Sequence, residues 1–343
     1  MYYFCTYFDQ RYLPRGLALY RSLKQHCPLF KLWVLCLDDA CYEVLSQLKD
    51  PGIHLLALEQ LERDDEELFR TKRNRTLIEY YFTCTPSLPL YIFDHFPEVE
   101  CITYLDADLF FFNSPTAVYD EISDKSIAII GHRHPPHLKH MDMHGLYNVG
   151  WVTFKRDEHA LECLHWWRDK CIEWCYDRVE DERFADQKYL DDWPKRFKKV
   201  VVIEHKGANL APWNLANYKI RERQKTVWVD EQPLIFFHFH GLKQVNSWLY
   251  DLNFAPFALR ASRIVRRKIY GAYVRTLIDI VQVISPYLAK VSVGRGIREG
   301  IAETGLPRDG YAAELMATAR WRWHISKEII ARRYLAIKLG LVL

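Results

Sequence analysis

Val99-Glu-Cys-Ile-Thr-Tyr-Leu105 is an apolar, β-prone stretch that runs directly into Asp106-Ala107-Asp108 and then into Leu-Phe-Phe-Phe112. Two carboxylates separated by one residue of extended backbone leave the same face of the chain, within roughly 7 Å of each other. They repel unless one takes a raised pKa or a divalent cation neutralises both. The apolar context favours a ligand site at a strand end over the alternative, a loop start with solvated aspartates.

Strand-like and helix-like segments alternate along the chain. Residues 2–8, 30–37 and 53–58 have the aromatic and β-prone character of strands, and 14–23 and 39–49 have helical spacing. This alternation predicts an α/β fold with a mainly parallel sheet covered by helices on both faces. The ligand site is expected at the carboxyl ends of the strands. Further strands are expected at 126–131, 148–154, 200–204 and 233–240, and a further helix at 157–175.

The charge distribution divides the chain into two parts. Residues 260–343 carry 16 Lys and Arg against 6 Asp and Glu, a net charge of +10, whereas residues 1–259 carry −7. The strand pattern ends near residue 250, so we expect an α/β domain over 1–250 and a basic helical extension over 251–343. The basic amphipathic helices expected in this extension suit binding to an anionic membrane surface. The alternative is that their basic side chains form the solvated face of helices that pack on the domain. Neither a nucleic-acid-binding motif nor stacking aromatics accompany the charge, so no nucleic-acid partner is expected.

Composition and cysteine usage predict a globular, cytoplasmic protein. The 343 residues are 49% hydrophobic and 27% charged, which argues against a disordered chain. The first residues do not have the pattern of a secretory signal, and no stretch has the roughly 20 clean apolar residues of a bilayer span. The nine cysteines are scattered without a disulfide framework, which is typical of a reducing compartment.

Possible zinc ligands occur together within the helix expected at 157–175. Cys171 and Cys175 are one helical turn apart, and Cys163 and His165 precede them. The same stretch carries Leu and Trp at core spacing, and buried free thiols are ordinary core residues. We therefore favour a core helix over a zinc site.

Five motifs in a fixed order carry a resemblance to a known family. They are Thr6-Tyr7-Phe-Asp9-Gln-Arg-Tyr12, Tyr104-Leu-Asp106-Ala107-Asp108, Tyr147-Asn148-Val-Gly150, Phe184-Ala-Asp186-Gln187 and His238-Phe-His240-Gly241-Leu-Lys243. In this order they resemble nucleotide-sugar glycosyltransferases of the GT-A fold. The retaining family 8, which includes glycogenin and bacterial galactosyltransferases of lipopolysaccharide assembly, is the most similar.

The resemblance implies a set of site residues. Asp106, Asp108 and His238 would hold Mn²⁺ or another divalent cation such as Mg²⁺, because oxygen ligands with one imidazole suit these ions. His240 is a rival to His238, since it lies two residues on and points to the same face. The implied catalytic residues, Asp186 and Gln187, would support the developing cation or bind sugar hydroxyls. The implied donor-binding residues are Thr6, Tyr7, Asp9, Tyr12, Asp106, Ala107, Asp108, Asn148, Gly150, Gly241 and Lys243.

Some of these positions have a structural alternative, and the chain departs from the family pattern at two points. Asp186 would also serve as a helix N-cap, and Gly150 would also mark a bulge. The family usually continues the last motif through Lys-Pro-Trp, whereas Lys243 comes one position early here. It also often has a basic residue about 16 positions before Asp-x-Asp. Residues 82–100 contain none, and the nearest upstream candidates are Arg73 and Arg75.

The resemblance implies a metal-dependent glycosyltransferase that moves a hexose from a nucleotide sugar, a UDP-sugar being expected, to a glycan with retention. The glycan would be a surface polysaccharide or lipopolysaccharide. One alternative is an inverting enzyme with Asp186 or Asp191 as the base. A sugar nucleotidyltransferase is another, although it calls for a Gly-rich basic loop, and residues 6–16 contain one Gly. A third is an inactive sugar-binding protein.

Two loops add candidate features. Residues 132–144 hold five of the 14 histidines, and we favour an acceptor-binding lid there over a second metal site or a mobile polar loop. Residues 207–214 combine Trp213 with amides, as sugar-binding surfaces do, and a core position for Trp213 is the alternative.

Overall fold

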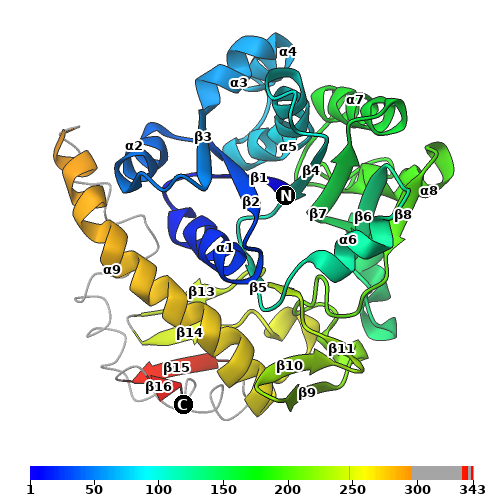
Figure 1. Cartoon of the computed structure of the whole chain (residues 1–343). Coiled ribbons are helices and arrows are strands. Elements are labelled where there is room, and N and C mark those ends of the chain that lie inside the picture. Colours follow the sequence, from blue (N-terminus) through cyan, green and yellow to red (C-terminus); the bar gives the residue numbers. More distant parts are fainter. Residues whose placement is uncertain (247, 295–333, 339–340, 343) are drawn as a thin grey trace.

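The computed structural model describes residues 1–246, 248–294, 334–338 and 341–342 (Figure 1). Its centre is a seven-stranded sheet with the strand order β3-β2-β1-β4-β7-β6-β8. Neighbouring strands are parallel throughout, except that β7 runs antiparallel to both β4 and β6. This confirms the prediction of an α/β fold with a mainly parallel sheet. The strands are β1 (Tyr2–Phe8), β2 (Phe30–Cys36), β3 (Ile53–Ala57), β4 (Cys101–Leu105), β6 (Ile127–Gly131), β7 (Tyr147–Lys155) and β8 (Val200–Ile203).

Helices cover both faces of the sheet. In β2, Leu32 and Val34 belong to one core cluster, while Trp33 and Leu35 belong to another. Successive side chains of a strand point to opposite faces, so both faces of β2 are buried and its sequence is almost continuously apolar. The helices are α1 (Leu13–His26), α2 (Asp39–Leu48), α3 (Leu58–Asp64), α4 (Glu66–Thr71), α5 (Leu77–His95), α6 (Thr116–Ile122), α7 (Glu158–Glu173), α8 (Trp193–Arg196) and α9 (Gly271–Gly294).

Local sequence signals account for the starts of several helices. Asp38 caps α2 by accepting a hydrogen bond from the backbone N–H of Cys41, and Asp157 caps α7 in the same way. Thr76 and Glu79 form a reciprocal capping box at the start of α5. Pro14 occupies the first turn of α1, where its missing N–H costs no helical hydrogen bond. Pro14 and Asp38 thereby start α1 and α2 at the edge of the sheet at which β1 and β2 end.

Short strands outside the main sheet matter for the site. β5 (Leu109–Phe111) pairs antiparallel with β12 (Phe236–His238). The single strand predicted over 233–240 is interrupted, because the backbone N–H groups of Ile235 and Phe236 both bond to the carbonyl of Gly207. Its first part is β11 (Gln232–Pro233), which forms a small antiparallel sheet with β9 (Ile220–Arg223) and β10 (Thr226–Val229).

The C-terminal part shares the core of the α/β domain. The π-helical turn η5 (Val265–Tyr270) leads into α9, which lies beside α1 and α2 (Figure 1). Ile269, Tyr273 and Ile280 are at most 2% exposed and belong to the same apolar cluster as Leu32 and Val34. The predicted domain boundary at residue 250 stays a prediction. The described helix of the C-terminal part, α9, packs on the α/β domain. No helix among the described residues combines the length and apolarity needed to cross a membrane.

The end of the chain differs from the predicted helical extension. Strands β15 (Tyr334–Lys338) and β16 (Leu341–Val342) join β13 (Lys243–Gln244) and β14 (Leu249–Asp251) in a four-stranded antiparallel sheet. The helical prediction is wrong for these two segments, because pairing with a distant strand overrides a weak local pattern. Residues 295–333 of the predicted extension lie outside the described residues.

We predict that Ile280→Ala in α9 destabilises the protein by about 2–5 kcal/mol, because the side chain is buried against the core. Val283→Ala is the matched control, since Val283 lies on the same helix and is 51% exposed. Its effect should stay within about 0.5 kcal/mol. Urea unfolding followed by tryptophan fluorescence measures both. Equal effects of the two substitutions would show that α9 does not contribute to the stability of the domain.

Candidate metal and donor site

The site forms where β4 ends. The backbone N–H of Asp106 bonds to the carbonyl of Gly150 on β7, and the N–H of Leu109 bonds back to the carbonyl of Asp106. This turn carries Asp106-Ala107-Asp108 from β4 into β5. The pairing of β5 with β12 sets His238 opposite Leu109, and the N–H of Phe239 bonds to the carbonyl of Asp108 at 3.0 Å. Strand register therefore brings a distant imidazole to the two carboxylates.

Asp106, Asp108 and His238 form a compact group whose candidate ligand atoms all lie within 4.8 Å of one another. The His238 Nε2 atom is 3.0 Å from Asp108 Oδ1 and 3.6 Å from Asp106 Oδ2. Two carboxylates and one imidazole form a donor set that fits Mn²⁺ or a similar divalent ion. The rival, His240, is exposed, and its ring centroid is 6.1 Å from that of His238. Among the described residues, this is the group of His, Cys, Asp and Glu side chains placed to hold a metal ion.

The three side chains have strongly perturbed ionisation. Burial raises the pKa of Asp106 to about 6, with His238 opposing the rise and the charge of Asp108 adding to it. For Asp108, burial also raises the pKa, but the charge and hydrogen bond of His238 outweigh it and bring the pKa to about 2. Burial lowers the pKa of His238, but the charge and hydrogen bond of Asp108, together with the charge of Asp106, raise it above its ordinary value. A bound cation displaces protons from these groups, so metal binding weakens as the pH falls through about 6, where Asp106 becomes protonated, and protonation of His238 adds to the loss.

Asn148 fixes the orientation of His238. The N–H of Gly150 donates to Asn148 Oδ1 at 3.1 Å, and the same oxygen lies 3.2 Å from His238 Nδ1. A backbone N–H can only donate, so this atom of the amide is the oxygen and the Nδ1 atom of His238 carries the proton. The Nε2 atom then faces the carboxylates. A Cβ at Gly150 would lie 2.6 Å from Asn148 Oδ1 and 3.0 Å from His238 Nδ1, which explains the glycine.

A second buried carboxyl, Asp186, lies beside the hydroxyl group of Thr85. Burial raises the pKa of Asp186 to about 7, with a hydrogen bond from Thr85 opposing the rise and the charge of Asp106 adding to it. The hydroxyl groups of Tyr7 and Thr85 are 3.0 Å apart, and Tyr104 donates to Asp106 at 3.0 Å. Sequence reasoning missed Thr85 and Tyr104. Tyr104 could have been found, because it lies two residues before Asp106 on the same strand face.

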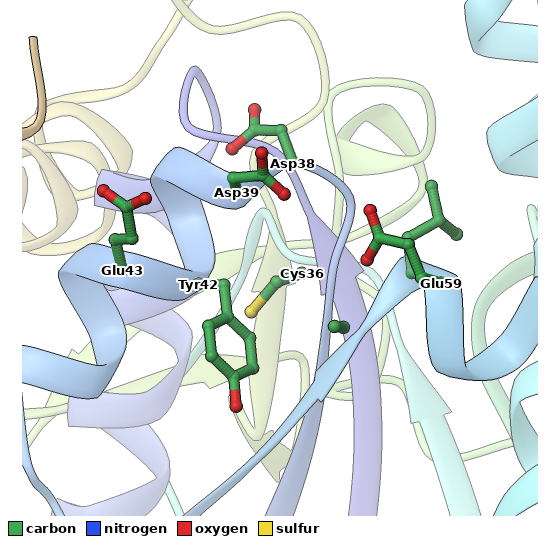
Figure 2. A pocket seen from close by; sticks show the side chains of 8 residues that line it. Cys36, Asp38, Asp39, Tyr42, Glu43 and Glu59 are labelled. Carbon is green, nitrogen blue, oxygen red and sulfur yellow. The ribbon is translucent and has the colours of Figure 1, made fainter. Parts of the chain in front are cut away.

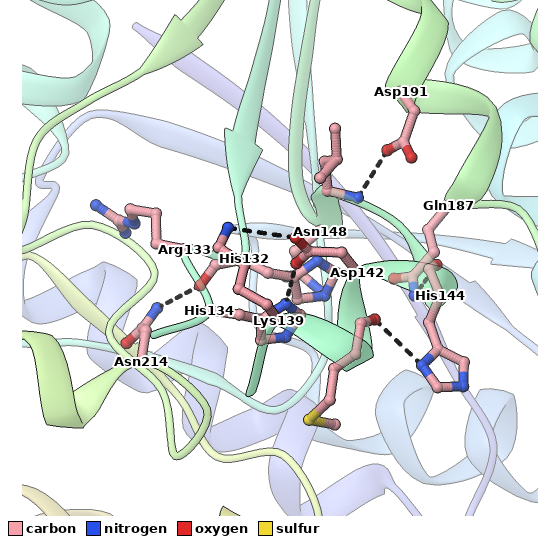
Figure 3. Close-up of polar contacts among 12 residues, drawn as sticks. His132, Arg133, His134, Lys139, Asp142, His144, Asn148, Gln187, Asp191 and Asn214 are labelled. Atoms are coloured by element: carbon pink, nitrogen blue, oxygen red, sulfur yellow. Dashed lines mark hydrogen bonds and ion pairs between the residues drawn. The ribbon is translucent and has the colours of Figure 1, made fainter. Parts of the chain in front are cut away.

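Gln187 is turned toward the histidine-rich loop. Its Nε2 atom donates to the carbonyl of His144 at 2.9 Å (Figure 3). Lys188 donates to the carbonyl of Asp142 and pairs with Asp191, and Asp191 in turn accepts the N–H of Leu146 at 2.7 Å. The start of η2 (Lys188–Asp192) therefore anchors the loop, and the carboxylate of Asp191 is engaged in that role.

The histidine-rich loop is an ordered element. Residues Pro136–His144 form the 3-10 helix η1, and His134 pairs with Asp142 at 2.8 Å (Figure 3). His132 stacks on His134 with a centroid distance of 4.9 Å and accepts a hydrogen bond from Asn148. Burial and the charge of His134 lower the pKa of His132 to about 3, so its ring is neutral. These contacts argue against a freely mobile polar loop.

Trp213 packs behind the histidines. Its side chain is 4% exposed, and its ring centroid lies 5.0 Å from that of His238 and 5.3 Å from that of His132. The core alternative for Trp213 is therefore the observed one. The tryptophan therefore packs against the rings of both His238 and His132.

The N-terminal motif lies in two environments. Thr6 is fully buried, whereas the ring of Tyr12 is 42% exposed. Asp9 holds the turn, because its Oδ1 atom accepts the N–H groups of Arg11 and Tyr12, each at 3.0 Å. Burial raises the pKa of Tyr12, and the charge of Asp108 adds to the rise.

The remaining donor-binding candidates have mixed positions. Ala107 is buried within the turn. Gly241 has a φ of +71°, and a Cβ there would overlap Asn253, so a glycine is needed for the turn. Lys243 is exposed in β13, where it pairs in register with Asp251. The guanidinium of Arg75 lies 4.0 Å from the ring centroid of Tyr176 and donates to the carbonyl of Ile172, so this arginine fastens the end of α7.

A cavity of about 180 Å³ opens near the same sheet edge, where β2 and β3 end (Figure 2). Asp38, at its wall, accepts the N–H of Gln10 and thereby ties the cavity to the turn after β1. Four carboxylates make its lining unfavourable for a diphosphate. The lining residues are Cys36, Asp38, Asp39, Tyr42, Glu43, Ala57, Leu58 and Glu59.

By sequence similarity, the chain belongs to a family with two proteins of Bacillus subtilis (strain 168). The first is the uncharacterized protein YfnD, which is 34% identical over 254 residues, covering 73% of this chain and 81% of YfnD. The second is the uncharacterized protein YfnF, which is 32% identical over 251 residues, covering 71% and 82%. No family model matches the chain.

Several solved glycosyltransferases are similar at a lower level. The galactosyltransferase LgtC, in complex with donor and acceptor sugar analogs, has 15% identity and a TM-score of 0.48, covering 70% of this chain and 87% of LgtC. The glycosyltransferase GlyE of Streptococcus pneumoniae TIGR4 has 13% identity and a TM-score of 0.48, covering 86% of this chain and 64% of GlyE. Mouse xyloside xylosyltransferase 1 has 12% identity and a TM-score of 0.46, covering 70% and 98%.

We predict that Asn148→Leu weakens Mn²⁺ binding about 10- to 100-fold, because His238 loses the acceptor that fixes its Nδ1 proton and its ring orientation. Asn148→Asp keeps an acceptor oxygen in the same place and should bind Mn²⁺ at least as tightly as the parent chain. Isothermal titration calorimetry with Mn²⁺ alone measures both. Parental affinity in the leucine variant would contradict this role for Asn148.

Proposed function

We propose that the protein is a metal-dependent glycosyltransferase that transfers a hexose from a nucleotide sugar, a UDP-sugar by preference, to a glycan acceptor. The observation that carries the proposal is the convergence of Asp106, Asp108 and His238 at the carboxyl end of β4. Ligand sites of open α/β sheets lie at this edge. The resemblance of the five sequence motifs to GT-A enzymes supports the same function.

The chemistry of sugar transfer matches this donor set. Breaking the bond between the sugar and a nucleoside diphosphate develops negative charge on the leaving phosphate oxygens. A divalent cation, when bound, neutralises that charge as a Lewis acid. Asp106, Asp108 and His238 would hold it, with Mn²⁺ or Mg²⁺ as the candidates. The buried position of Asp108 and His238 strengthens their interaction with a cation relative to water.

The residues around this group divide into a nucleoside side and a sugar side. The exposed ring of Tyr12 and the turn held by Asp9 would receive the nucleoside. Asp186, with its pKa raised to about 7, would bind a sugar hydroxyl, and the hydroxyl groups of Tyr7 and Thr85 would border it. Gln187, which bonds to His144, would then act by holding η1 near the acceptor rather than by touching the sugar.

The stereochemical course is part of the proposal. In a retaining, front-side transfer, the leaving phosphate takes the proton of the acceptor, so no separate carboxylate base is required. Asp191 is engaged with Leu146 and Lys188, which weakens its candidacy as a base. The inverting alternative would use Asp186, and the anomeric configuration of the product separates the two courses.

Two other classes make different demands of the chain. A sugar nucleotidyltransferase would need backbone N–H groups and cations in the turn after β1 to hold a triphosphate. Here two N–H groups of that turn are bonded to the carboxylate of Asp9. An inactive sugar-binding protein would show no donor turnover. Hydrolysis of the donor by the parent chain would therefore exclude this class.

We predict that Asp106→Ala and Asp108→Ala each lower Mn²⁺-dependent release of UDP from the preferred UDP-sugar at least about 100-fold, because each removes a charged cation ligand. Asp39→Ala, an exposed carboxylate of α2 near the same sheet edge, is the control and should keep parental activity. Chelation with EDTA should abolish the parental reaction, and added Mn²⁺ should restore it. Metal-independent release by the parent chain, or full activity in both variants, would refute the proposal.

The acceptor is proposed to be a surface polysaccharide or lipopolysaccharide assembled at the cytoplasmic face of a membrane. The exposed basic residues Arg263, Arg267 and Arg275, on η5, α9 and the turn before them, would attract anionic lipid headgroups. A deletion is unsuitable as a test, because α9 packs in the core of the domain.

We predict that changing Arg263, Arg267 and Arg275 together to Gln weakens binding to anionic vesicles at least about 10-fold, since each cation near such a surface contributes about 1 kcal/mol. The control changes Lys195, Lys198 and Lys199, which are also exposed, to Gln. Flotation with vesicles of phosphatidylglycerol and phosphatidylcholine measures both. Equal loss in the two triple variants would show that net charge alone, rather than this surface, governs binding.

A further inference from the structure

The three residues that converge at the end of β4, Asp106, Asp108 and His238, include no permanently charged cation for the diphosphate. Lys243 is exposed on β13, and Arg75 is engaged with Tyr176 and Ile172 at the end of α7. The three metal-ligand candidates and a divalent cation do not compensate the full negative charge of the leaving diphosphate. Two carboxylates cancel a divalent cation, whereas the diphosphate leaves with one more negative charge than it had in the donor. A positive group beside the cation would stabilise that extra charge.

Arg15 has the position that this chemistry requires. It lies in the first turn of α1, directly after Pro14, and is partly exposed. Its Nη2 atom donates to the carbonyl of Leu242 at 2.8 Å, and its guanidinium carbon lies 4.5 Å from the ring centroid of Tyr12. The arginine thus joins the start of α1 to the segment that follows His238.

Backbone contacts continue from Arg15 to the carboxylate group. The N–H of Leu242 bonds to the carbonyl of Phe239, and the N–H of Phe239 bonds to the carbonyl of Asp108. A Cβ at Gly16 would overlap the ring of Phe8, so the glycine lets the first turn of α1 approach the end of β1 closely. The pKa of Asp108 agrees with this position. Burial raises that pKa, His238 and His240 lower it, and the charge of Arg15 lowers it further.

The buried end of α9 closes the same region. The Tyr273 ring stacks on Phe239 at a centroid distance of 3.8 Å. Burial raises the pKa of Tyr273, and the charge of Arg15 opposes the rise. Arg15 itself is held by its contacts with the Tyr12 ring and the Leu242 carbonyl.

We propose that Arg15 is a binding residue for the diphosphate of the nucleotide donor, an inference that rests on the proposed function and extends it. Its bond to Leu242 fixes the plane of the guanidinium while using one of five N–H donors. A fixed guanidinium plane can present two parallel donors to phosphate oxygens, which a lysine cannot do. The same side chain flanks Tyr12, so nucleoside and diphosphate recognition would meet at the first turn of α1.

The test compares four full-length chains by isothermal titration calorimetry: the parent, Arg15→Met, Arg15→Lys and Arg21→Met. Arg21 is exposed on the same helix and gives the matched loss of one charge. The probes are Mn²⁺ alone, and inorganic pyrophosphate or UDP at saturating Mn²⁺. Thermal melts without ligand check the fold of each variant.

Arg15→Met should bind pyrophosphate and UDP about 10- to 100-fold more weakly than the parent, as expected for losing hydrogen bonds to a charged group. Its affinity for Mn²⁺ alone should be unchanged or higher, because a positive charge near the site is gone. Arg15→Lys should lie between the two, and Arg21→Met should match the parent. If Arg15→Met is unstable, the folded Arg15→Lys chain decides by its loss of affinity.

Two kinds of failure are distinguishable. Parental affinity of both Arg15 variants for pyrophosphate and UDP would overturn the role of Arg15 and leave the proposed function intact. So would an equal loss in Arg21→Met, or a loss of Mn²⁺ binding alone. Absence of pyrophosphate and UDP binding in the parent chain with Mn²⁺ would overturn the proposed function itself.

Discussion

The structure depends on one electrostatic constraint, the placing of two carboxylates beside an imidazole at the end of β4. Asp108 and His238 are both buried, and a buried charge is costly unless an opposite charge balances it. The 3.0 Å contact between Asp108 and His238 meets that requirement within the chain. The pairing of β5 with β12 holds the groups in place, so the sheet itself keeps a charged site assembled.

Around this group, neutral polar contacts restrict the freedom of each side chain. Asn148 fixes the His238 ring, and Gly150 leaves the space that this contact needs. Tyr104 bonds to Asp106 on the other side. Such contacts orient the ligands before a cation arrives, which lowers the entropic cost of binding. The anchoring of η1 by Gln187 extends the same order to the proposed acceptor side.

The packing of α9 gives the C-terminal part a structural role. The helix lies on α1 and α2 and closes an apolar cluster that reaches the β5–β12 pair through Phe239 and Tyr273. Loss of this helix would expose that cluster to water. The basic residues of η5 and α9 therefore belong to an element that also supports the site, and their charge can be altered without removing the element.

The sequence by itself determined the α/β fold, the strand that ends in Asp106 and Asp108, and the motif residues that meet there. Alternating apolar periods and a strand-end Asp-Ala-Asp are local properties, so they can be read along one chain. Tertiary structure decided that Arg15 bonds to Leu242 while Arg75 bonds to Ile172, that Gln187 holds a loop, and that residues 334–338 form a strand. These outcomes depend on contacts between residues far apart in sequence, whose geometry is set by packing and strand register and leaves no local pattern.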